Sequence, residues 1–392
     1  MSRESSALQV ELWSEARWRS SRAEYDALHE QSSADRLFLS WDWLTLWWES
    51  LVPRTDGDVL QMLAAREGGK LVGMMPVFRD IAQRRRLRYR VANLLGGCVR
   101  QARGVFSEYL DVVALPGREN EVRRECVSKL LGIERYSEIA VATTPGFEDW
   151  SAVFRLHGRW RGGYVRTIDH MTSYQADLAK GFEAYLDSLG ANARRSIFNL
   201  RKRLQTHGEV HFERVTPVDR TEGLEILNGL HRQRWGTPAF GPMTTGLQQA
   251  LMHAWRDTDR VQMSKLNVAG KTVSMLHDLR VGGVQYNIQM GFDPTFDASL
   301  SLGLLHLGYA MEAAAAEGVA TYDFLAGKGR VADYKKRIAS RSRQLASVQY
   351  FHSPLLSMAF RAHDSLRRLQ RPKVQVAEPP ASGARRPQSP QS

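Results

Sequence analysis

Three side chains in the last third of the sequence have the chemistry to move protons. Asp323 lies in an otherwise apolar run, where a carboxylate costs free energy unless it is paired or functional. His277 also lies among apolar residues, and an imidazole titrates near neutral pH. Tyr334 follows the Asp323 run and carries a phenol that can donate a proton. Asp323 and His277 are therefore candidates for acid–base catalysis.

Each of these side chains also has a structural alternative. Asp323 could accept hydrogen bonds from the backbone or from Arg330, and a lone histidine in a strand often belongs to the core or to an edge. No Ser-His-Asp order, zinc-ligand spacing, Walker loop or dinucleotide fingerprint occurs, so we expect no metal. Only two cysteines are present, Cys98 and Cys126, and we expect both to be buried, unpaired thiols.

Residues 261–336 predict the strands and the helix that carry these groups. Glycine-containing turns separate three runs that predict antiparallel strands at about 261–268, 272–280 and 284–291. A helical period from Leu302 to Glu317 ends at Gly318. The apolar run Ala320–Leu325 then predicts a buried strand that pairs in parallel, because a helix leads into it.

This order of meander, helix and strand resembles the second half of a GNAT-type acyltransferase. The closer likeness is to the bacterial CelD-like or BioF2-like acetyltransferases, which are associated with cellulose and exopolysaccharide production and are related to FemAB-type aminoacyl transferases. The residues that carry it are Ser188–Leu189 through Arg194 and Leu204, Gly291–Asp293, Tyr322–Gly327 and Tyr334–Lys336.

The resemblance implies acetyl-CoA or another acyl-CoA as the donor. Its pyrophosphate is expected on backbone N–H groups at the start of the helix, here Ala298–Gly303, where the chain has a single glycine instead of the usual Gln/Arg-x-x-Gly-x-Gly/Ala loop. The implied cofactor-binding residues are Gln289, Met290, Ser299, Ser301, Gly303 and Lys335.

The resemblance also implies roles around the reacting groups. Tyr334 would protonate the departing thiolate, with Asp323 and His277 as the other catalytic candidates. Arg194, Trp235 and Tyr286 are assigned to the acceptor. The loop Arg234–Pro242, rich in glycine and proline, is either a lid over the acceptor or a packed interhelical loop.

An earlier part of the chain repeats the same element order. A hairpin over 59–78, a strand at 109–113, a helix at 119–131 and a strand at 138–142 echo 261–325, and an extended connection follows at 155–178. A Trp-rich helix at 38–51 is either a core helix or a surface for stacking a sugar or base. We therefore expect an α/β fold of two tandem GNAT-like units, each a mainly antiparallel meander with helices packed on a mixed sheet.

The predicted boundaries are an N-terminal GNAT-like domain at 1–160, an acetyltransferase domain at 161–353, a basic helix at 354–370 and a disordered tail at 371–392. The formal charge of +12 suits an anionic partner. Arg361, Arg367 and Arg368 predict peripheral contact with an anionic membrane, whereas nucleic acid is not expected apart from tRNA. The lack of a signal peptide or long apolar run predicts a cytoplasmic protein, with peripheral contact at the inner membrane face as the option. A bacterial source is implied by the resemblance alone.

Three functions remain open at this stage. The first is acyl transfer, N- or O-acetylation above all, from acyl-CoA to an amine or hydroxyl of a sugar or polysaccharide precursor. The second is an aminoacyl-tRNA-dependent transferase of the FemAB type, which the basic segment 192–204 would serve through phosphate contacts. The third is a catalytically silent GNAT fold that acts as a partner of a polysaccharide synthase.

Overall fold

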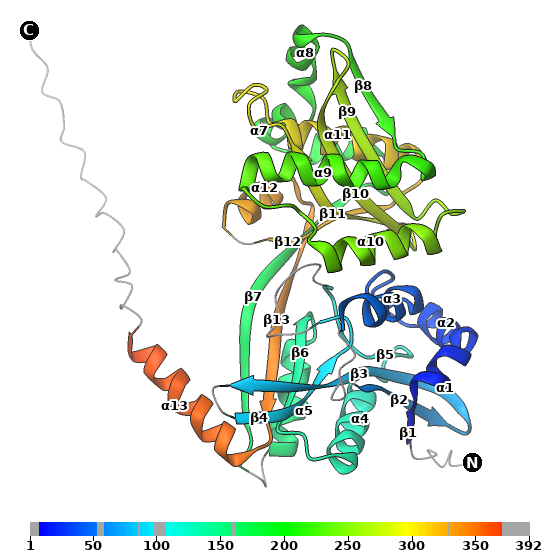
Figure 1. Cartoon of the computed structure of the whole chain (residues 1–392), viewed down its shortest axis with the longest axis vertical. Helices are drawn as coiled ribbons and strands as arrows, with labels where there is room; N and C mark the ends of the chain where they lie inside the picture. The colour runs from blue at the N-terminus through cyan, green and yellow to red at the C-terminus, as the bar shows by residue number, and fades with distance from the viewer. Residues whose placement is uncertain are drawn as a thin grey trace, which may run out of the picture.

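One continuous sheet runs through both halves of the chain (Figure 1). The structure, a computed structural model, describes residues 8–52, 59–84, 87–97, 107–158, 162–327 and 329–370. In these residues the strand order is β1-β2-β3-β4-β6-β13-β7-β12-β11-β10-β9-β8, and β5 pairs with β3 beside this path. The first five strands in this order belong to the N-terminal half, and the last five belong to the C-terminal half.

The strands and helices have the following bounds. The strands are β1 (Gln9–Trp13), β2 (Val59–Glu67), β3 (Lys70–Arg84), β4 (Leu87–Leu94), β5 (Val113–Ala114), β6 (Glu138–Thr144), β7 (Tyr164–Asp177), β8 (Val210–Arg214), β9 (Val261–Val268), β10 (Lys271–Val281), β11 (Val284–Phe292), β12 (Thr321–Gly327) and β13 (Arg341–Phe351). The α-helices are α1 (Glu15–Ser20), α2 (Arg22–Gln31), α3 (Trp41–Leu51), α4 (Glu119–Ile133), α5 (Phe147–Gly158), α6 (Phe182–Ser188), α7 (Ala191–Arg194), α8 (Arg201–Leu204), α9 (Arg220–Trp235), α10 (Pro242–Ala254), α11 (Leu302–Ala316), α12 (Arg330–Ile338) and α13 (Pro354–Gln370). The π-helical turn η1 (Arg195–Asn199) links α7 to α8.

The C-terminal unit confirms the predicted meander, helix and parallel strand. Strands β9, β10 and β11 pair antiparallel in sequence order, with tight turns between them. Helix α11 follows, and β12 pairs in parallel with β11 from Val284 opposite Thr321 to Tyr286 opposite Asp323. Glycine turns and hydrophobic period were sufficient here because every connection is local or a single helical crossover.

The N-terminal unit repeats this order with two corrections. The predicted hairpin, the helix at 119 and the strand at 138 are confirmed as β2–β3, α4 and β6. The predicted strand at 109–113 is wrong, because Tyr109 has a left-handed φ of 58° and only Val113–Ala114 forms a strand. The extended stretch at 155–178 is wrong in its first part, where α5 continues to Gly158 before β7 begins.

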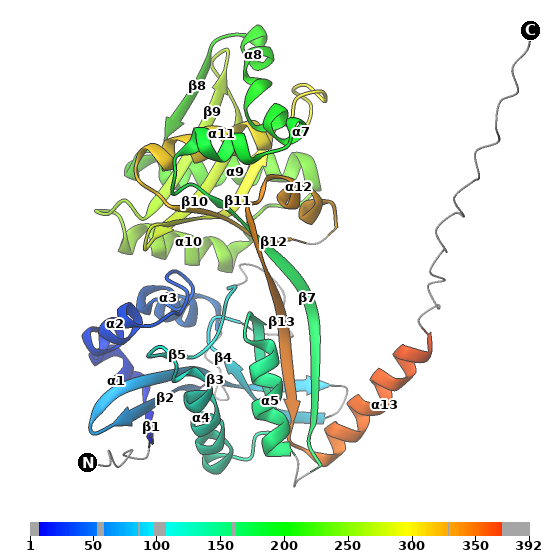
Figure 2. The ribbon, with the colours of Figure 1, turned by 180° about the vertical axis from the view of Figure 1, so that it is seen from behind.

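Strands β7 and β13 join the two units. Strand β13 pairs with β6 on one side and along β7 on the other, and β7 also pairs with β12. Figures 1 and 2 show both strands spanning the distance between the two halves. Residues 341–351, which we placed with the C-terminal unit, thus also complete the sheet of the N-terminal unit, and the boundary at residue 160 stays a prediction.

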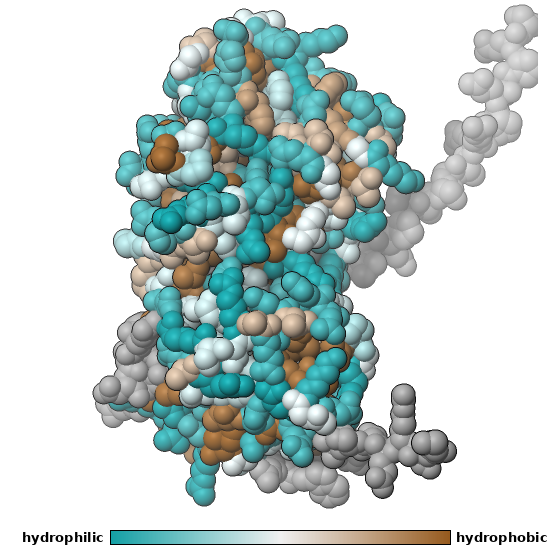
Figure 3. Space-filling view, turned by 90° about the vertical axis from the view of Figure 1, so that its right-hand side faces the viewer, coloured by the Kyte–Doolittle hydropathy of each residue, from teal (hydrophilic) through white to brown (hydrophobic). Residues whose placement is uncertain are grey.

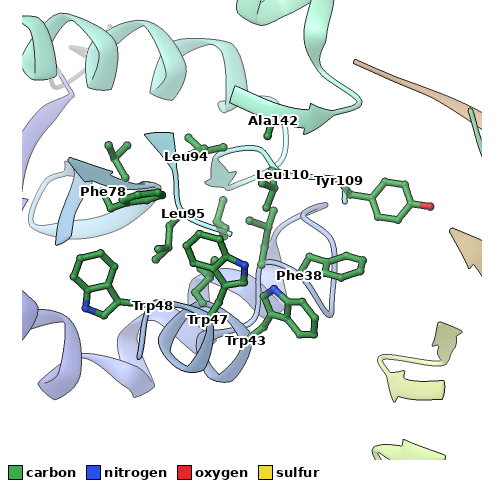
Figure 4. Close-up of a cluster of buried hydrophobic side chains, with 14 of the residues drawn as sticks. Phe38, Trp43, Trp47, Trp48, Phe78, Leu94, Leu95, Tyr109, Leu110 and Ala142 are labelled. Atoms are coloured by element: carbon green, nitrogen blue, oxygen red, sulfur yellow. The ribbon is translucent and has the colours of Figure 1, made fainter. Parts of the chain in front are cut away.

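The tryptophans of α3 lie in the N-terminal core. Trp43, Trp47 and Trp48 are buried; Trp47 and Trp48 lie beside Phe78, and Trp43 packs edge-on against Phe38 (Figure 4). The Trp43 indole donates to Ser107 Oγ at 2.8 Å, which satisfies its N–H inside the core. The Trp-rich segment is therefore a core helix, as one of its two interpretations predicted.

The cysteine expectation is confirmed for one of the two thiols. Cys126, on α4, is buried and unpaired. Cys98 lies outside the described residues, as does the tail expected at 371–392.

Helix α11 and the turn η1 approach each other closely in the C-terminal unit. Helix α11 packs against η1, and a Cβ built on Gly308 would overlap the carbonyl oxygen of Ile197. This backbone approach leaves no room for any side chain. By contrast, a Cβ built on Gly229, inside α9, would have no neighbour within 4 Å.

We expect Gly308→Ala to lower the free energy of unfolding by about 1–3 kcal/mol, because an inserted methyl forces two backbones apart. Urea denaturation measures this change. The matched control is Gly229→Ala, which adds the same methyl in open space and should be neutral or stabilising by about 0.5–1 kcal/mol. Equal effects of the two substitutions would contradict the close contact.

One face of the body has a mainly hydrophilic surface. On the face that Figure 3 shows, hydrophilic residues surround small, separate groups of hydrophobic ones. Helix α13 begins directly after β13 and extends away from the body (Figures 1 and 2). Among the described residues, no helix is long and apolar enough to cross a membrane.

Candidate active site

Charged side chains from both units meet where the two units join. Asp323, on β12, accepts hydrogen bonds from the Tyr109 hydroxyl at 2.9 and 3.1 Å and from Gln175 Nε2 at 2.8 Å. Its Oδ1 also accepts from the backbone N–H of Leu325 at 2.7 Å. Tyr109 leaves the tryptophan core and points toward the ribbons of the C-terminal unit (Figure 4). Asp323 therefore connects its own strand β12 with β7 and with the loop that carries Tyr109.

A bulge in β12 brings two more charges into this cluster. The pairing of β12 with β7 shifts between Asp323 and Ala326, and Leu325 has a φ of 59°. Both carboxylate oxygens of Glu108 accept from the Ala326 N–H at 2.9 Å. Lys335, on α12, donates from Nζ to the carbonyl oxygens of Leu325 at 3.2 Å and Ala326 at 2.8 Å. The bulge is thus held by a carboxylate from one unit and an ammonium from the other.

Burial shifts the pKa of each of these groups toward its neutral form. It raises the pKa of Glu108 to about 8, aided by the negative charge of Asp323, and it raises the pKa of Asp323 itself. It lowers the pKa of Lys335 to about 8, against the pull of Glu108 and Asp323. The pKa values of Glu108 and Lys335 therefore lie near physiological pH.

Asp35, like Tyr109, belongs to the cluster and also lines a cavity. Its Oδ1 accepts from the N–H groups of Leu37 at 3.0 Å and Phe38 at 2.7 Å, and its Oδ2 accepts from the Tyr286 hydroxyl at 3.1 Å. Burial, with a smaller contribution from the charge of Asp323, raises the pKa of Asp35 to about 7. A carboxyl with this pKa, at the wall of a cavity, suits general base catalysis.

The cavity beside Asp35 has a volume of about 240 Å³ and a mainly acidic wall. Four carboxyl groups and two guanidinium groups line it, from Asp35, Asp111, Glu119, Asp149, Arg123 and Arg343. Arg123 pairs with Asp111 at 2.6 Å and with Asp149 at 3.3 Å, so its charge is largely compensated. The cavity therefore presents carboxylates and guanidinium groups side by side, and its carboxylates can accept hydrogen bonds from a ligand.

Strands β11 and β12 separate next to the same cluster. Their parallel pairing ends at Tyr286 and Asp323, whereas β11 continues to Phe292 with pairing to β10. Both Tyr286, which contacts Asp35, and Asp323 lie at this point of separation. The opening between the strands therefore starts at the charged cluster.

Three of the predicted site residues belong to this cluster. Asp323 has the hydrogen-bonding role that we gave as its alternative, with Tyr109, Gln175 and Leu325 as donors. Tyr286, expected at the acceptor, contacts Asp35. Lys335, expected at the cofactor, contacts the β12 bulge.

Other predicted residues lie elsewhere. His277 is buried and its Nε2 shares a hydrogen bond of 2.7 Å with Gln248 of α10, while burial lowers its pKa to about 3. Arg194 donates to the Leu186 carbonyl at 3.0 Å, and Trp235 is exposed at the end of α9. The structure does not bring these three residues into the cluster.

The predicted cofactor residues surround the start of α11 and the end of β11. Ser299 donates from its N–H at 2.8 Å and from its hydroxyl at 2.5 Å to Asp297, whereas Ser301 is the α11 N-cap without a side-chain hydrogen bond to the helix. A Cβ on Gly303 would lie 3.0 Å from the Phe292 ring and 3.2 Å from Met290 Sδ. On β11, the Gln289 side chain accepts from the Met290 N–H at 3.0 Å.

Tyr334 lies on α12, one residue before Lys335, and packs partly buried against the C-terminal core. Burial raises the pKa of its phenol to about 12, and the nearby charge of Arg234 opposes this shift. Its phenol is therefore protonated at neutral pH and can act as an acid.

Sequence reasoning missed Asp35, Glu108 and Tyr109. Asp35 lies in a polar turn, Ser32–Asp35, that leads into the Trp-rich helix, Tyr109 begins the stretch that we predicted as a strand, and Glu108 directly precedes it. Two consecutive residues with a carboxylate and a phenol in a non-strand segment were the available signal. Their significance depends on contacts to residues more than 200 positions away, which no local pattern contains.

Comparison with known proteins agrees with this fold. Residues 191–336 match the acetyltransferase (GNAT) domain family. The fold of the chain is similar to that of FemX, with a TM-score of 0.58, 11% identity and coverage of 83% of this chain and 95% of FemX. It is also similar to a conserved protein of unknown function from Bacteroides thetaiotaomicron VPI-5482, with a TM-score of 0.50, 12% identity and coverage of 84% and 96%.

A tandem GNAT protein from the clavulanic acid biosynthesis pathway aligns with a TM-score of 0.48 at 10% identity, over 89% of this chain and 99% of that chain. No curated protein matches the sequence at a significant level.

Proposed function

We propose that the chain, whose residues 191–336 match the acetyltransferase (GNAT) domain family, transfers an acyl group from acyl-CoA to an acceptor bound in the cavity beside Asp35. The observation that carries the proposal is Asp35: a carboxyl with a pKa of about 7 at the wall of a 240 Å³ cavity, beside the separation of β11 and β12. Donor and acceptor would meet at this point.

The acceptor is an amine or hydroxyl of a sugar or polysaccharide precursor, and the cavity favours the amine. Carboxylates such as Glu119 and Asp149 accept hydrogen bonds from hydroxyl groups and attract an ammonium group. An amino sugar presents both. Asp35 would remove the proton that an amine must lose to become a nucleophile.

Two different residues would accept and donate the protons of the reaction. Asp35 takes a proton from the acceptor nitrogen or oxygen as the new acyl bond forms and the acyl–sulfur bond breaks. Tyr334 gives a proton to the departing thiolate. The bulged form of β12 is held by Tyr109, Asp323, Glu108 and Lys335. This would fix the position of the acceptor side of the site relative to the donor side.

The donor would be held at the start of α11. Ser301 caps this helix without a side-chain hydrogen bond, so the first N–H groups of α11 can serve a phosphate. Gly303 allows the turn to lie directly on Phe292 and Met290.

We expect Ser301→Asp to weaken acyl-CoA binding by about tenfold or more while leaving the fold intact. An aspartate at an N-cap stabilises the helix, but its charge repels a pyrophosphate at the same N–H groups. Isothermal titration with acetyl-CoA measures the affinity. The matched control is Gly241→Asp at the N-cap of α10, where a Cβ has open space, which should leave the affinity unchanged. Unchanged binding in Ser301→Asp would remove the donor from this helix terminus.

The function itself is tested by turnover. The full chain is incubated with acetyl-CoA or longer acyl-CoAs and a panel of amino sugars, neutral sugars and simple amines, and thiol release is followed. Thermal shift reports binding separately, since a donor at about 100 times its dissociation constant adds about 2.7 kcal/mol of stability. Binding without transfer to any acceptor would contradict the proposed acceptor class, and absence of acyl-CoA binding would contradict the donor.

An aminoacyl-tRNA donor is the second candidate, and the whole-chain similarity to FemX favours it at the level of fold. The basic segment 192–204 is only partly available to contact tRNA phosphates. The Arg201 guanidinium lies 3.8 Å from the centre of the Tyr309 ring and pairs with Glu312. Acyl transfer from charged tRNA, with binding that falls steeply with salt, would establish it instead. If neither donor supports transfer, the remaining candidate is a catalytically silent GNAT fold that acts as a partner of a polysaccharide synthase.

A further inference from the structure

Helix α13 has two apolar faces, and the body covers one of them. Leu356 and Phe360 are buried against Tyr89 and Val91 of β4, and the ring of Phe360 stacks on Phe351 with ring centres 4.0 Å apart. Asp364 faces the same way, where it accepts from the Tyr164 hydroxyl at 2.9 Å. This side fixes the helix to the N-terminal unit.

The opposite face is apolar and open. Leu355, Met358 and Leu366 are 69%, 63% and 59% exposed, and Ala362 is exposed between them. Spacings of three, four and four residues place all four on one side of a helix. We call this set the outer face of α13. Exposed apolar residues at helical spacing differ from single ones scattered over a surface, and such a face marks an interaction site.

Arg361 borders the outer face, and its guanidinium lies 5.4 Å from the centre of the Tyr164 ring. Arg367 is exposed on the side of the helix that also carries Phe360 and Asp364, and the only acidic side chain in the helix, Asp364, is turned inward. The outer face therefore combines apolar side chains with positive charge and no exposed carboxylate of its own.

We infer that the outer face of α13 binds an anionic lipid surface, with the helix lying in the plane of the interface. Apolar side chains enter the boundary of the acyl chains while arginines contact the headgroups, which is how a basic amphipathic helix associates with a bilayer. A second copy of the chain fits less well, because it would bring the same arginines against each other without an acidic partner. The net charge of +12 acts in the same direction.

The test is flotation of the full chain with vesicles of phosphatidylcholine alone or with about one third phosphatidylglycerol. We expect binding to the anionic vesicles that weakens with salt, and little binding to the neutral ones. The triple variant Leu355→Ser, Met358→Ser, Leu366→Ser should weaken binding about tenfold or more, since it removes the inserted groups. Neutralising Arg361 and Arg367 with glutamine should cost about fivefold for each arginine.

The control is the pair Val218→Ser and Met243→Ser, which removes exposed apolar side chains from the C-terminal unit and should leave vesicle binding unchanged. All substituted side chains are exposed, so the melting temperature checks that folding is unaffected. Binding that is absent, or that persists in the triple variant, would overturn the inference. So would self-association in solution that the triple variant abolishes, because the outer face would then be a contact between copies.

Discussion

Asp35→Asn should lower turnover by about 10²–10⁴-fold, the usual contribution of a general base. Asparagine keeps the shape of the side chain, and its oxygen can still accept from the N–H groups of Leu37 and Phe38. The ability to take a proton is lost, and the Tyr286 hydroxyl, which donates to Oδ2 in the wild type, must instead accept from the new amide N–H. Steady-state kinetics with the acceptor identified in the turnover assay gives kcat and KM separately, and the loss should fall on kcat.

The pH dependence follows from the raised pKa of Asp35. In the wild type, kcat/KM should rise with pH through about 7 as the carboxyl ionises, and the variant should lack this step. The effect on stability has the opposite sign. A carboxyl whose pKa rises from 3.8 to about 7 on folding stabilises the native state below its unfolded pKa, and this contribution is lost as pH rises through about 7. Asp35→Asn should therefore melt higher than the wild type at pH 8.

The matched control is Asp149→Asn, which removes a carboxylate from the same cavity without contacting Tyr286 or the β12 bulge. We expect a change of a few fold in KM and little change in kcat, since Asp149 can only help to hold the acceptor. Normal kcat in Asp35→Asn would move the base function to Glu108, whose raised pKa of about 8 makes it the next candidate.

The sequence predicted the elements of the C-terminal unit better than the site. Turns at Ala269–Lys271 and Gly282–Gly283, and a helix ending before Gly318, are local signals that the structure confirms. Strand β13 was missed because its polar first half hides the buried residues Leu345–Phe351. Its pairing with both β6 and β7 depends on partners far away in the sequence.

The site shows the same limit more strongly. Asp323 was recognisable because a carboxylate in an apolar strand is unusual on its own. Asp35 and Glu108 were not, because a carboxylate in a polar turn or loop is ordinary until the fold buries it beside another charge. Burial and the nearby Asp323 create their raised pKa values, and both conditions arise only when the two units dock. A cluster of this kind costs stability, which is expected where function requires it.

Tyr334→Phe should also lower turnover by about 10²–10⁴-fold while acyl-CoA binding barely changes. Burial raises the pKa of this phenol to about 12, so it is protonated throughout the neutral range and can supply a proton to a thiolate. Phenylalanine keeps the ring that packs against the C-terminal core and removes the proton. Thiol release under saturating acyl-CoA measures the chemical step, and titration of coenzyme A measures binding.

The matched control is Tyr309→Phe on α11, whose ring stacks on Phe212 and Arg201 and should tolerate the loss of its hydroxyl without a change in turnover. If Tyr334→Phe turns over normally, Tyr334 is a packing residue and a water or Asp323 must protonate the thiolate. If binding collapses instead, its hydroxyl holds the donor. Because α12 carries both Tyr334 and Lys335, a loss of kcat with unchanged binding would mean that one helix supplies the acid on one side and secures the β12 bulge on the other.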